Sequence, residues 1–552
     1  MLSTWVGRHG IGPKAVMHGD ADRSVRSSFH IFWAGGTSMH FKTVASALVL
    51  SGFVAGSLVM PAPANADEHL PPIAKNVIIM VTDGASWGTW DMASYWEYGE
   101  LGHQPYDSFP VKLGMTTTPL NTARTPQFSG VPQVDYDWTQ AWDVTPVDTL
   151  DYRGNPNYFA GYEYIKKDYT DSAAAGTALA AGEKSYNSAI NFDDFALPLD
   201  TIVQKAKAKG RATGSISSVP ISHATPAALG GAQNITRGNL HEISKQMLDD
   251  GILDVWMGGG HPFYDGNGQL RDTPNYRWIA EEDLNRVIDG ETPWTLISAK
   301  EDFEKLAAGI DLPTGPLLGI PEVAATLQYN RSRDPAVMGT DDTLPSGIAY
   351  IDSVPTLATM TQAALNVLGQ NENGLYLHVE GGAVDWAAHA NDTARIIEEQ
   401  MDFNHSVKAV VDWVEMYSDW DETMLLVVTD HGNAIPMGPN SDTIPFEPVE
   451  NRGKGELPGV LWHSGTHTNE NTLLFAKGAG TEMLYNHIVG YDAGLALFLR
   501  HNDGAFIEND AIGMVMMEAL EPVPLPASVI FLGSGLVALF AVARRRMNKL
   551  AA

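Results

Sequence analysis

The sequence contains no cysteine among its 552 residues. Disulfide bonds and thiolate metal sites are therefore excluded, and any metal ion has to be bound by His, Asp, Glu or hydroxyl oxygens. Basic residues are also scarce, since 35 Lys and Arg stand against 66 Asp and Glu and leave a formal charge of −31. This balance argues against a nucleic-acid or anionic-membrane partner. An anionic ligand would have to be attracted by local cations, because the overall field of the protein repels it.

The N-terminal region has the pattern of an export signal. Residues 1–38 show no periodicity, and we expect a non-structural extension there. Residues 39–66 read as a signal peptide, with Lys42 followed by an apolar run and an Ala-Asn-Ala cleavage site at 64–66. Either Met39 is the true start or the positively charged region of the signal is extended. The pattern predicts an exported protein.

The C-terminal region, residues 521–552, is the second segment that we separate from the body. It reads VPLPA at 523–527, then an apolar run at 528–543, then three arginines at 544–546. Counted from Val523 to residue 543 the segment has 21 residues, which is just enough to span a bilayer, with the arginines on the cytoplasmic side. This layout resembles the PEP-CTERM sorting tail of bacterial exported proteins, which implies an exosortase-type partner. A plain tail anchor is the alternative. The body is expected in the periplasm, on the cell surface or outside the cell.

The body, residues 67–520, reads as one large α/β domain. Three apolar runs are typical of buried strands, and helical patterns such as 394–417 alternate with them. Alternating strands and helices predict a large, mostly parallel central sheet with helices on both faces. Residues 85–169 and 262–350 read as insertions beside this core.

Each of the three apolar runs ends in a carboxylate. Asp83 follows the run at 77–81, Glu380 the run at 375–379, and Asp430 the run at 424–428. Ligands of open α/β sheets bind at the carboxyl ends of the strands. Three carboxylates meeting there would repel one another unless cations lie between them. One such ending is commonplace in turns, but three of them predict a site for several metal ions.

Asp385 and His389 follow four residues apart in a segment that reads as helix. This spacing places both side chains on one helical face, and the two ligand types suit Zn²⁺. Gly381 and Gly382 are expected to let the backbone turn sharply between Glu380 and this helix. The alternative is an ordinary strand-to-helix turn with polar surface residues.

Ser172 begins a run of small residues, SAAAGTALAA, that predicts a helix. A serine at a helix N-terminus lies where free N–H groups favour an anion, and a nearby metal can activate its hydroxyl as a nucleophile. The alternative is a plain N-cap on an Ala-rich helix.

Six segments in order now resemble the alkaline phosphatase family. They are VTDG at 81–84, TDSAAAGTA at 170–178, HATPAA at 223–228, EGGAVDWAAH at 380–389, TDHG at 429–432 and HTNE at 467–470. The resemblance implies a phosphomonoesterase with a Ser172 nucleophile and a phosphoserine intermediate. It also implies two Zn²⁺ and one Mg²⁺.

The ligand sets follow from this resemblance. One Zn²⁺ would be bound by Asp385, His389 and His467, and the second by Asp83, Asp430 and His431. Mg²⁺ would be bound by Asp83, Thr225 and Glu380. Arg237 is expected to hold the phosphate, while Asp171 and His223 would contact the site without binding a metal directly. His463, four residues before His467, is a further candidate for this site, and a solvated loop histidine is the alternative.

Several alternatives stay open at this point. A phosphodiesterase or sulfatase of the same superfamily would use a similar fold, and a non-enzymatic surface protein could have inherited it. The sequence also leaves open Zn²⁺ against Co²⁺, the phosphoester that serves as substrate, and whether the chain forms a homodimer.

Overall fold

The computed structural model of the protein describes residues 73–522. The predicted N-terminal extension, the signal peptide and the tail from residue 523 onward lie outside these residues. Between residues 73 and 522, no helix is both long and apolar enough to cross a membrane. The predicted membrane-spanning segment at 523–543 lies outside these residues and is therefore untested.

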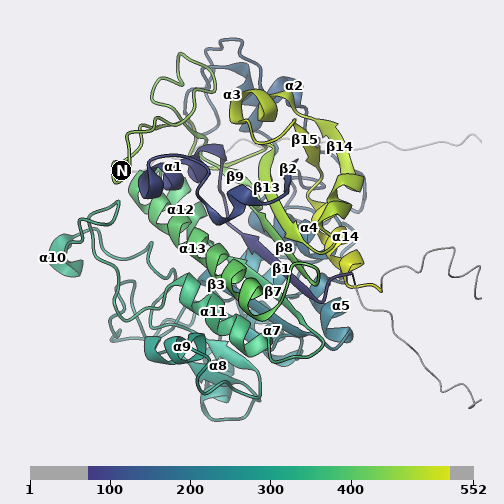
Figure 1. Cartoon of the computed structure of the whole chain (residues 1–552), viewed down its shortest axis with the longest axis vertical. Coiled ribbons are helices and arrows are strands. Elements are labelled where there is room, and N and C mark those ends of the chain that lie inside the picture. Colours follow the sequence, from purple (N-terminus) through teal and green to yellow (C-terminus); the bar gives the residue numbers. More distant parts are fainter. Residues whose placement is uncertain (1–72, 523–552) are drawn as a thin grey trace, which may run out of the picture. The chain divides into compact units, whose positions relative to one another are not determined.

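The centre of the described part is a sheet of 11 strands (Figure 1). From one edge to the other the order is β14 (Ile488–Tyr491), β15 (Ala505–Ile507), β2 (Val111–Met115), β13 (Thr472–Gly478), β8 (Thr423–Val428), β1 (Asn76–Val81), β7 (Leu375–Glu380), β3 (Ala212–Pro220), β4 (Val255–Gly259), β6 (Leu317–Gly319) and β5 (Thr295–Ile297). The seven strands from β8 to β5 run parallel, whereas β13 is antiparallel to both of its neighbours. This confirms the predicted mostly parallel sheet.

Helices cover both faces of the sheet. Successive residues of a strand point to opposite sides, so the apolar strands present side chains to the helices on each face. Ile78 and Met80 of β1 belong to a core that includes α1 (Trp87–Tyr98), α9 (Lys300–Ala307), α11 (Leu357–Leu368), α12 (Ala383–His389) and α13 (Thr393–Tyr417). Val77, Ile79 and Val81 belong to a second core that includes α4 (Ser172–Ala181), α5 (Ile202–Ala208), α6 (Ala224–Leu229), α7 (Leu240–Asp249), α8 (Glu281–Ile288) and α14 (Asp510–Ala519).

Short elements complete the described part. The helices are η1 (Pro105–Ser108), α2 (Trp138–Ala141), α3 (Ala160–Ile165), α10 (Pro335–Met338), η2 (Thr481–His487) and η3 (Leu495–Leu499). Two small two-stranded sheets pair β9 (Gly432–Asn433) with β12 (His467–Thr468), and β10 (Pro436–Met437) with β11 (Leu461–Trp462).

The three predicted strands are confirmed, and they are neighbours in the sheet. β1 lies between β7 and β8, with Val81 opposite both Glu380 and Val428. The carboxylates that end these strands therefore emerge side by side at one edge of the parallel sheet. This register creates the site described below.

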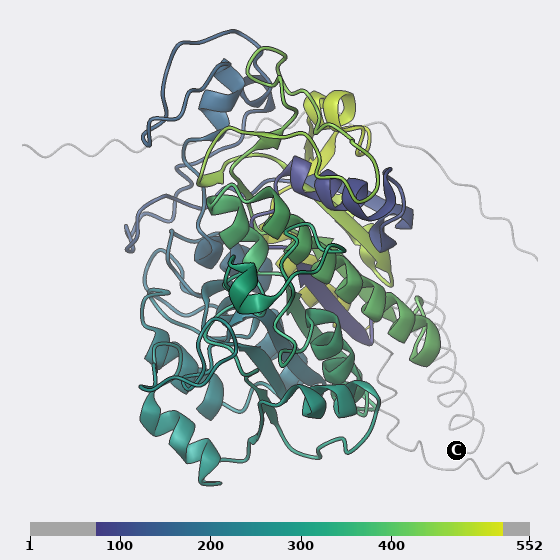
Figure 2. The same ribbon diagram turned by 90° about the vertical axis from the view of Figure 1, so that its left-hand side faces the viewer.

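The two segments predicted to be insertions are more than additions to the core. Segment 85–169 contains β2, which pairs with β13 and β15 inside the central sheet. Segment 262–350 contains β5 and β6, which form one edge of that sheet. Its helices α8 and α9, in teal, lie at the end of the molecule away from the yellow C-terminal strands in both views (Figures 1 and 2). Strands β5 and β6 were missed because each is only three residues long.

Candidate active site

A cavity of about 800 Å³ lies beyond the carboxyl ends of the central strands. Its lining includes Ser172, Arg237, Asp385, His389 and His467. These five side chains come from four separate segments of the sequence, which the fold brings together at this cavity.

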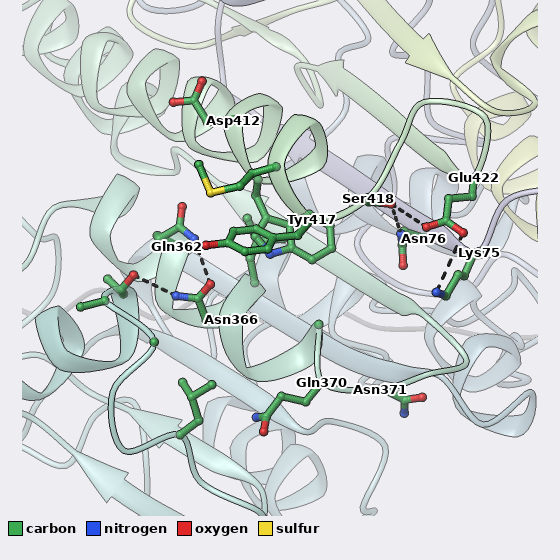
Figure 3. A pocket seen from close by; sticks show the side chains of 18 residues that line it. Lys75, Asn76, Gln362, Asn366, Gln370, Asn371, Asp412, Tyr417, Ser418 and Glu422 are labelled. Carbon is green, nitrogen blue, oxygen red and sulfur yellow. Dashed lines mark hydrogen bonds and ion pairs between the residues drawn. The ribbon is translucent and has the colours of Figure 1, made fainter.

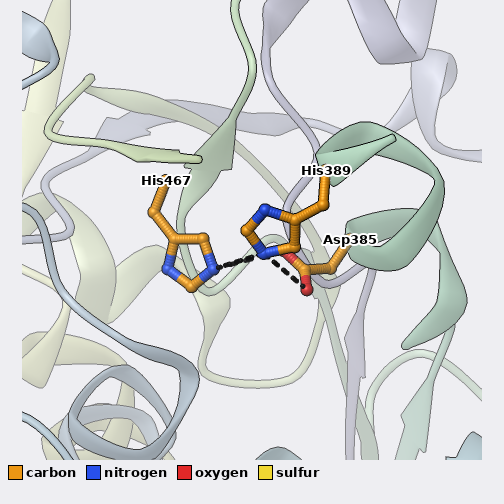
Figure 4. A group of neighbouring side chains, drawn as sticks. All are labelled: Asp385, His389 and His467. Atoms are coloured by element: carbon orange, nitrogen blue, oxygen red, sulfur yellow. Dashed lines mark hydrogen bonds and ion pairs between the residues drawn. The ribbon is translucent and has the colours of Figure 1, made fainter. Parts of the chain in front are cut away.

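The first ligand group at this cavity consists of Asp385, His389 and His467. His467 Nε2 lies 3.2 Å from His389 Nε2 and 3.4 Å from Asp385 Oδ1. His389 Nε2 lies 3.4 Å from Asp385 Oδ2 (Figure 4). Asp385 and His389 lie on one face of α12, as their spacing predicts, and the β12 strand supplies His467.

The second ligand group consists of Asp83, Asp430 and His431, all of which are fully buried. His431 Nε2 lies 3.4 Å from Asp83 Oδ1 and 3.3 Å from Asp430 Oδ2. His431 and His467 stack with ring centroids 3.7 Å apart, so the two groups adjoin. Among residues 73–522, these are the two groups of three His or carboxylate side chains close enough to share a metal ion.

An all-oxygen group lies on the other side of Asp83. Thr225 Oγ1 is 3.4 Å from Asp83 Oδ2. Glu380 accepts a hydrogen bond from Ser217, and its carboxyl also interacts with Asp83 and Thr225. The structure thus brings together the three predicted Mg²⁺ ligands.

The three histidines of these groups all turn Nε2 toward the cluster. His467 Nδ1 lies 2.9 Å from the Thr170 carbonyl, and His389 Nδ1 lies 3.0 Å from the Gly465 carbonyl. His431 Nδ1 lies 3.3 Å from the Gly432 carbonyl. A carbonyl can only accept, so Nδ1 is the protonated nitrogen and Nε2 presents a lone pair. This is the tautomer that a metal ligand requires.

The pKa values of the buried carboxyl groups in the cluster differ strongly from their ordinary values. Burial and the charge of Asp430 raise the pKa of Glu380 to about 8. Burial and the charge of Asp385 raise the pKa of Asp430 to about 6. Burial and three neighbouring carboxylates raise the pKa of Asp83 well above its usual range. Burial opposes ionisation of Asp385 too, but the surrounding histidines hold its pKa well below the usual range.

These groups fit divalent cations. Asp83 Oδ1, Glu380 Oε1 and Asp430 Oδ2 are buried without a hydrogen-bond partner in the described part of the chain. Unpaired buried carboxylate oxygens are costly, and a cation between them removes both the desolvation penalty and the mutual repulsion. The donor types agree, because the histidine-bearing groups suit Zn²⁺ and the oxygen group suits Mg²⁺.

Ser172 lies beside the second ligand group, at the first turn of α4. Its Oγ lies 3.2 Å from His431 Nε2. The preceding residue, Asp171, caps the helix by accepting a hydrogen bond from the Ala174 N–H at 3.1 Å. Ala-rich composition keeps the helix slim, and Gly176 lies so close to α6 that a Cβ there would be 2.9 Å from the Ala228 Cβ. The serine is therefore presented to the cavity from a rigid helix end.

Arg237 lies beside Ser172 with both ends of its guanidinium engaged. Nη1 donates to Asp171 Oδ2 at 3.2 Å, and Nη2 faces His223 Nε2 at 3.3 Å. Burial and the charge of Arg237 lower the pKa of His223 to about 3, so the imidazole is neutral and can accept this hydrogen bond. Asp171 and His223 thus fix the arginine without belonging to a ligand group.

Two sequence interpretations need correction. Gly381 and Gly382 do not adopt left-handed backbone angles. They are required by close packing, because a Cβ on Gly382 would lie 2.6 Å from Val219 and one on Gly381 would lie 3.0 Å from Phe403. His463 stays apart from both ligand groups, since its Nε2 bonds to Ser441 Oγ at 2.7 Å and its ring packs on Tyr162.

The sequence reasoning missed residues that orient the ligands. Asn433 Nδ2 donates to Asp385 Oδ1 at 2.7 Å. Ser217 donates to Glu380 from the adjacent strand β3. Asn433 could have been suspected because it follows the TDHG segment directly, whereas Ser217 has no distinguishing sequence context.

A second cavity, of about 660 Å³, lies at the opposite, amino ends of the strands (Figure 3). Its polar side chains are paired with one another, for example Asn76 with Ser418 at 3.0 Å and Gln362 with Asn366 at 3.0 Å. It contains neither of the ligand groups. The chemistry of the described residues is concentrated in the first cavity.

Comparison with known proteins agrees with this geometry. The family model for alkaline phosphatase matches residues 148–448. The chain belongs to the alkaline phosphatase family. Ser172, Arg237, Asp385, His389 and the two carboxylates Glu380 and Asp430 all fall within the matched range.

Two bacterial alkaline phosphatases are similar to this chain in sequence. Alkaline phosphatase 4 of Bacillus subtilis is 31% identical over 269 residues, which cover 48% of this chain and 49% of the relative. The alkaline phosphatase of Escherichia coli is 30% identical over 322 residues, covering 52% of this chain and 64% of the relative. The match thus spans about half of the length of the Bacillus relative and less than two thirds of the Escherichia one.

Solved structures of alkaline phosphatases share the fold. The enzyme of the Antarctic bacterium TAB5 superimposes with a TM-score of 0.52 at 19% identity, over 81% of this chain and 98% of that one. The cold-active enzyme of a Shewanella species gives a TM-score of 0.53 at 22% identity, over 81% and 99%. The 11-stranded sheet is therefore that of the alkaline phosphatase family.

Proposed function

We propose that the protein is a metal-dependent phosphomonoesterase that releases inorganic phosphate through a phosphoserine on Ser172. The observation that carries this proposal is the position of Ser172 Oγ, 3.2 Å from Nε2 of His431 in the second ligand group. Family membership supports it, because the similar proteins named above are alkaline phosphatases.

The ligand groups support a two-zinc, one-magnesium site. Asp385, His389 and His467 would bind one Zn²⁺, and Asp83, Asp430 and His431 the other. Asp83, Thr225 and Glu380 would bind Mg²⁺. A TAB5 alkaline phosphatase variant holds magnesium in the site called M3. When bound, the ions lower the pKa of hydroxyl groups and water and neutralise the departing alkoxide.

The protein's own residues supply positioning and charge. Ser172 Oγ forms a bond to phosphorus as the bond to the ester oxygen breaks, and water later displaces phosphate from the serine. The N-terminus of α4 attracts the phosphate through its free N–H groups. Arg237, fixed by Asp171, can donate to the phosphate oxygens. The serine side chain is buried at the bottom of the cavity, which keeps bulk water away from the reaction.

The cellular setting belongs to the proposal as well. The signal peptide at 39–66 and the sorting tail at 521–552 support an exported enzyme that works in the periplasm, on the cell surface or outside the cell. An exosortase-type enzyme would be the partner for the tail, and a homodimer is the oligomeric state that we propose. The catalytic domain would comprise residues 67–520.

Hydrolysis of p-nitrophenyl phosphate tests the proposed function. We expect release of phosphate with an alkaline optimum and loss of activity on incubation with a chelator, followed by recovery when zinc and magnesium are restored. Bis-p-nitrophenyl phosphate and p-nitrophenyl sulfate are the matched controls. Faster turnover of the diester or the sulfate would favour the phosphodiesterase or sulfatase alternative, and no turnover of any of them would refute the enzyme.

A further inference from the structure

The mouth of the active-site cavity carries two arginines that the proposed reaction does not use. Arg124 and Arg153 both line the cavity and are exposed. Neither forms an ion pair with a carboxylate within the described residues, although acids outnumber bases by 66 to 35 in the chain. Arg452 and Arg333, by comparison, are exposed arginines that pair with Glu450 and Asp392.

Arg153 is held in place by hydrogen bonds that leave part of it available. Its Nε donates to Tyr152 Oη at 2.9 Å, and its Nη1 donates to the Gly465 carbonyl at 2.6 Å. Tyr152 is braced in turn by Tyr169, with 3.0 Å between the two hydroxyl oxygens. Nη2 has no hydrogen-bond partner among the described residues, so it can donate to a ligand. A guanidinium with a free edge is suited to a carboxylate or phosphate.

Arg153 is also close to the reaction centre. The carbonyl oxygen of Gly465 that accepts from Arg153 also accepts from His389 Nδ1 at 3.0 Å. Because His389 belongs to the first ligand group, the Gly465 carbonyl connects Arg153 directly to that group. Arg124 differs, since it makes no hydrogen bond within residues 73–522 and contributes only its charge.

The direction of the reaction relates these arginines to the substrate. The nucleophile, Ser172, is at the buried end of the cavity. In an in-line displacement the leaving group departs on the side opposite the nucleophile. The alcohol portion of the ester therefore extends toward the mouth, where Arg124 and Arg153 lie.

We propose that Arg124 and Arg153 form a second anion-binding position, and that the enzyme prefers phosphomonoesters whose alcohol portion carries another phosphate or carboxylate. This inference rests on the proposed function and adds the substrate class. The aromatic side chains of Tyr152, Tyr169 and Trp386 also line this cavity and give the alcohol portion an apolar wall.

A matched pair of substrates tests the preference. Phenyl phosphate and 4-carboxyphenyl phosphate differ by one carboxylate, so the ratio of their kcat/KM values reports how that charge is recognised. We expect Arg153→Gln and Arg124→Gln each to lower the ratio of the charged to the uncharged substrate about threefold, and the double variant about tenfold. High salt should lower the ratio of the full-length wild-type protein and leave that of the double variant nearly constant.

Two further variants make the result specific. Arg452→Gln removes the same charge from an exposed arginine outside the cavity and should keep the wild-type ratio. Arg153→Lys keeps the charge and should retain most of the preference. The inference is overturned if the ratio of the two kcat/KM values stays constant in the single and double variants. This holds even if Arg153→Gln slows the turnover of both substrates equally through its contact with Gly465. Absence of turnover of both substrates by the wild type overturns the proposed function and the inference with it.

Discussion

At the residue scale, Asp171 shows how one side chain organises the reaction centre. One carboxylate oxygen accepts hydrogen bonds from the N–H groups of Ala174 at 3.1 Å and Ser188 at 2.9 Å. The other accepts from Arg237 at 3.2 Å. The helix that presents Ser172 and the arginine proposed to bind phosphate are therefore fixed by the same group.

Replacing Ser172 by alanine tests the nucleophile. The variant lacks the oxygen that we propose to form the phosphoserine, so we expect kcat for p-nitrophenyl phosphate to fall by about 10³-fold or more. Metal content should stay at the wild-type level, because the carboxylate and histidine ligands remain. Stopped assays with phosphate detection and elemental analysis of the same sample measure both quantities.

Ser108→Ala is the control for this substitution, since Ser108 is an exposed serine in η1 outside the cavity. It should keep wild-type kinetics. Near-normal turnover in Ser172→Ala would exclude the serine as nucleophile.

At the scale of elements, α13 holds the segment 320–350 through buried polar contacts. Arg331 of that segment is buried and bonds to Glu398 of α13 at 2.7 Å, while Glu398 also accepts from the Ser346 N–H at 2.9 Å. The neighbouring Glu399 is buried, and one of its oxygens has no partner in the described part of the chain. Burial and the charge of Asp402 raise the pKa of Glu399 to about 8, although Arg331 opposes the shift.

We expect Glu399 to make the free energy of unfolding decrease as pH rises. Between its unfolded pKa of 4.5 and its folded pKa of about 8, the native state keeps a proton that the unfolded state has released. The free energy of unfolding should then decrease by up to about 1.4 kcal/mol per pH unit across this window. The Glu399→Gln variant mimics the protonated side chain. Its free energy of unfolding should therefore decrease by about 2 kcal/mol less than that of the wild type between pH 5.5 and 7.5.

Urea unfolding of the wild type and the variant at these two pH values measures the difference. Glu415→Gln changes an exposed carboxyl on the same helix and should follow the wild type. Equal pH dependence in Glu399→Gln and wild type would contradict the assignment.

The sequence predicted elements whose pattern is local. The strands β1, β7 and β8 are predominantly apolar runs, and Asp385 and His389 have a helical spacing, so both features were recognisable. Strands β5 and β6 were missed because three residues carry too little pattern, and β2 was read as part of an insertion. Ser217 was missed because its contact with Glu380 depends on the register between β3 and β7. Arg153 could not be related to His389 either, since only the folded chain brings both to the Gly465 carbonyl.

At the scale of the whole molecule, an acidic protein has to bind an anionic substrate, which requires positive charge concentrated at the binding site. A chain with a formal charge of −31 repels a phosphoester at a distance. Arg124, Arg153 and Arg237 line the cavity that the first ligand group also lines. Cations bound by the ligand groups would reverse the sign of the field inside the cavity, which is why we regard the metal ions as the central element of the account.

Elemental analysis of the active, full-length protein tests this claim most directly. Protein that hydrolyses p-nitrophenyl phosphate should contain two zinc ions and one magnesium ion per chain, and activity should follow zinc content as a chelator removes it. Fully active protein with fewer than two transition-metal ions per chain would contradict the account.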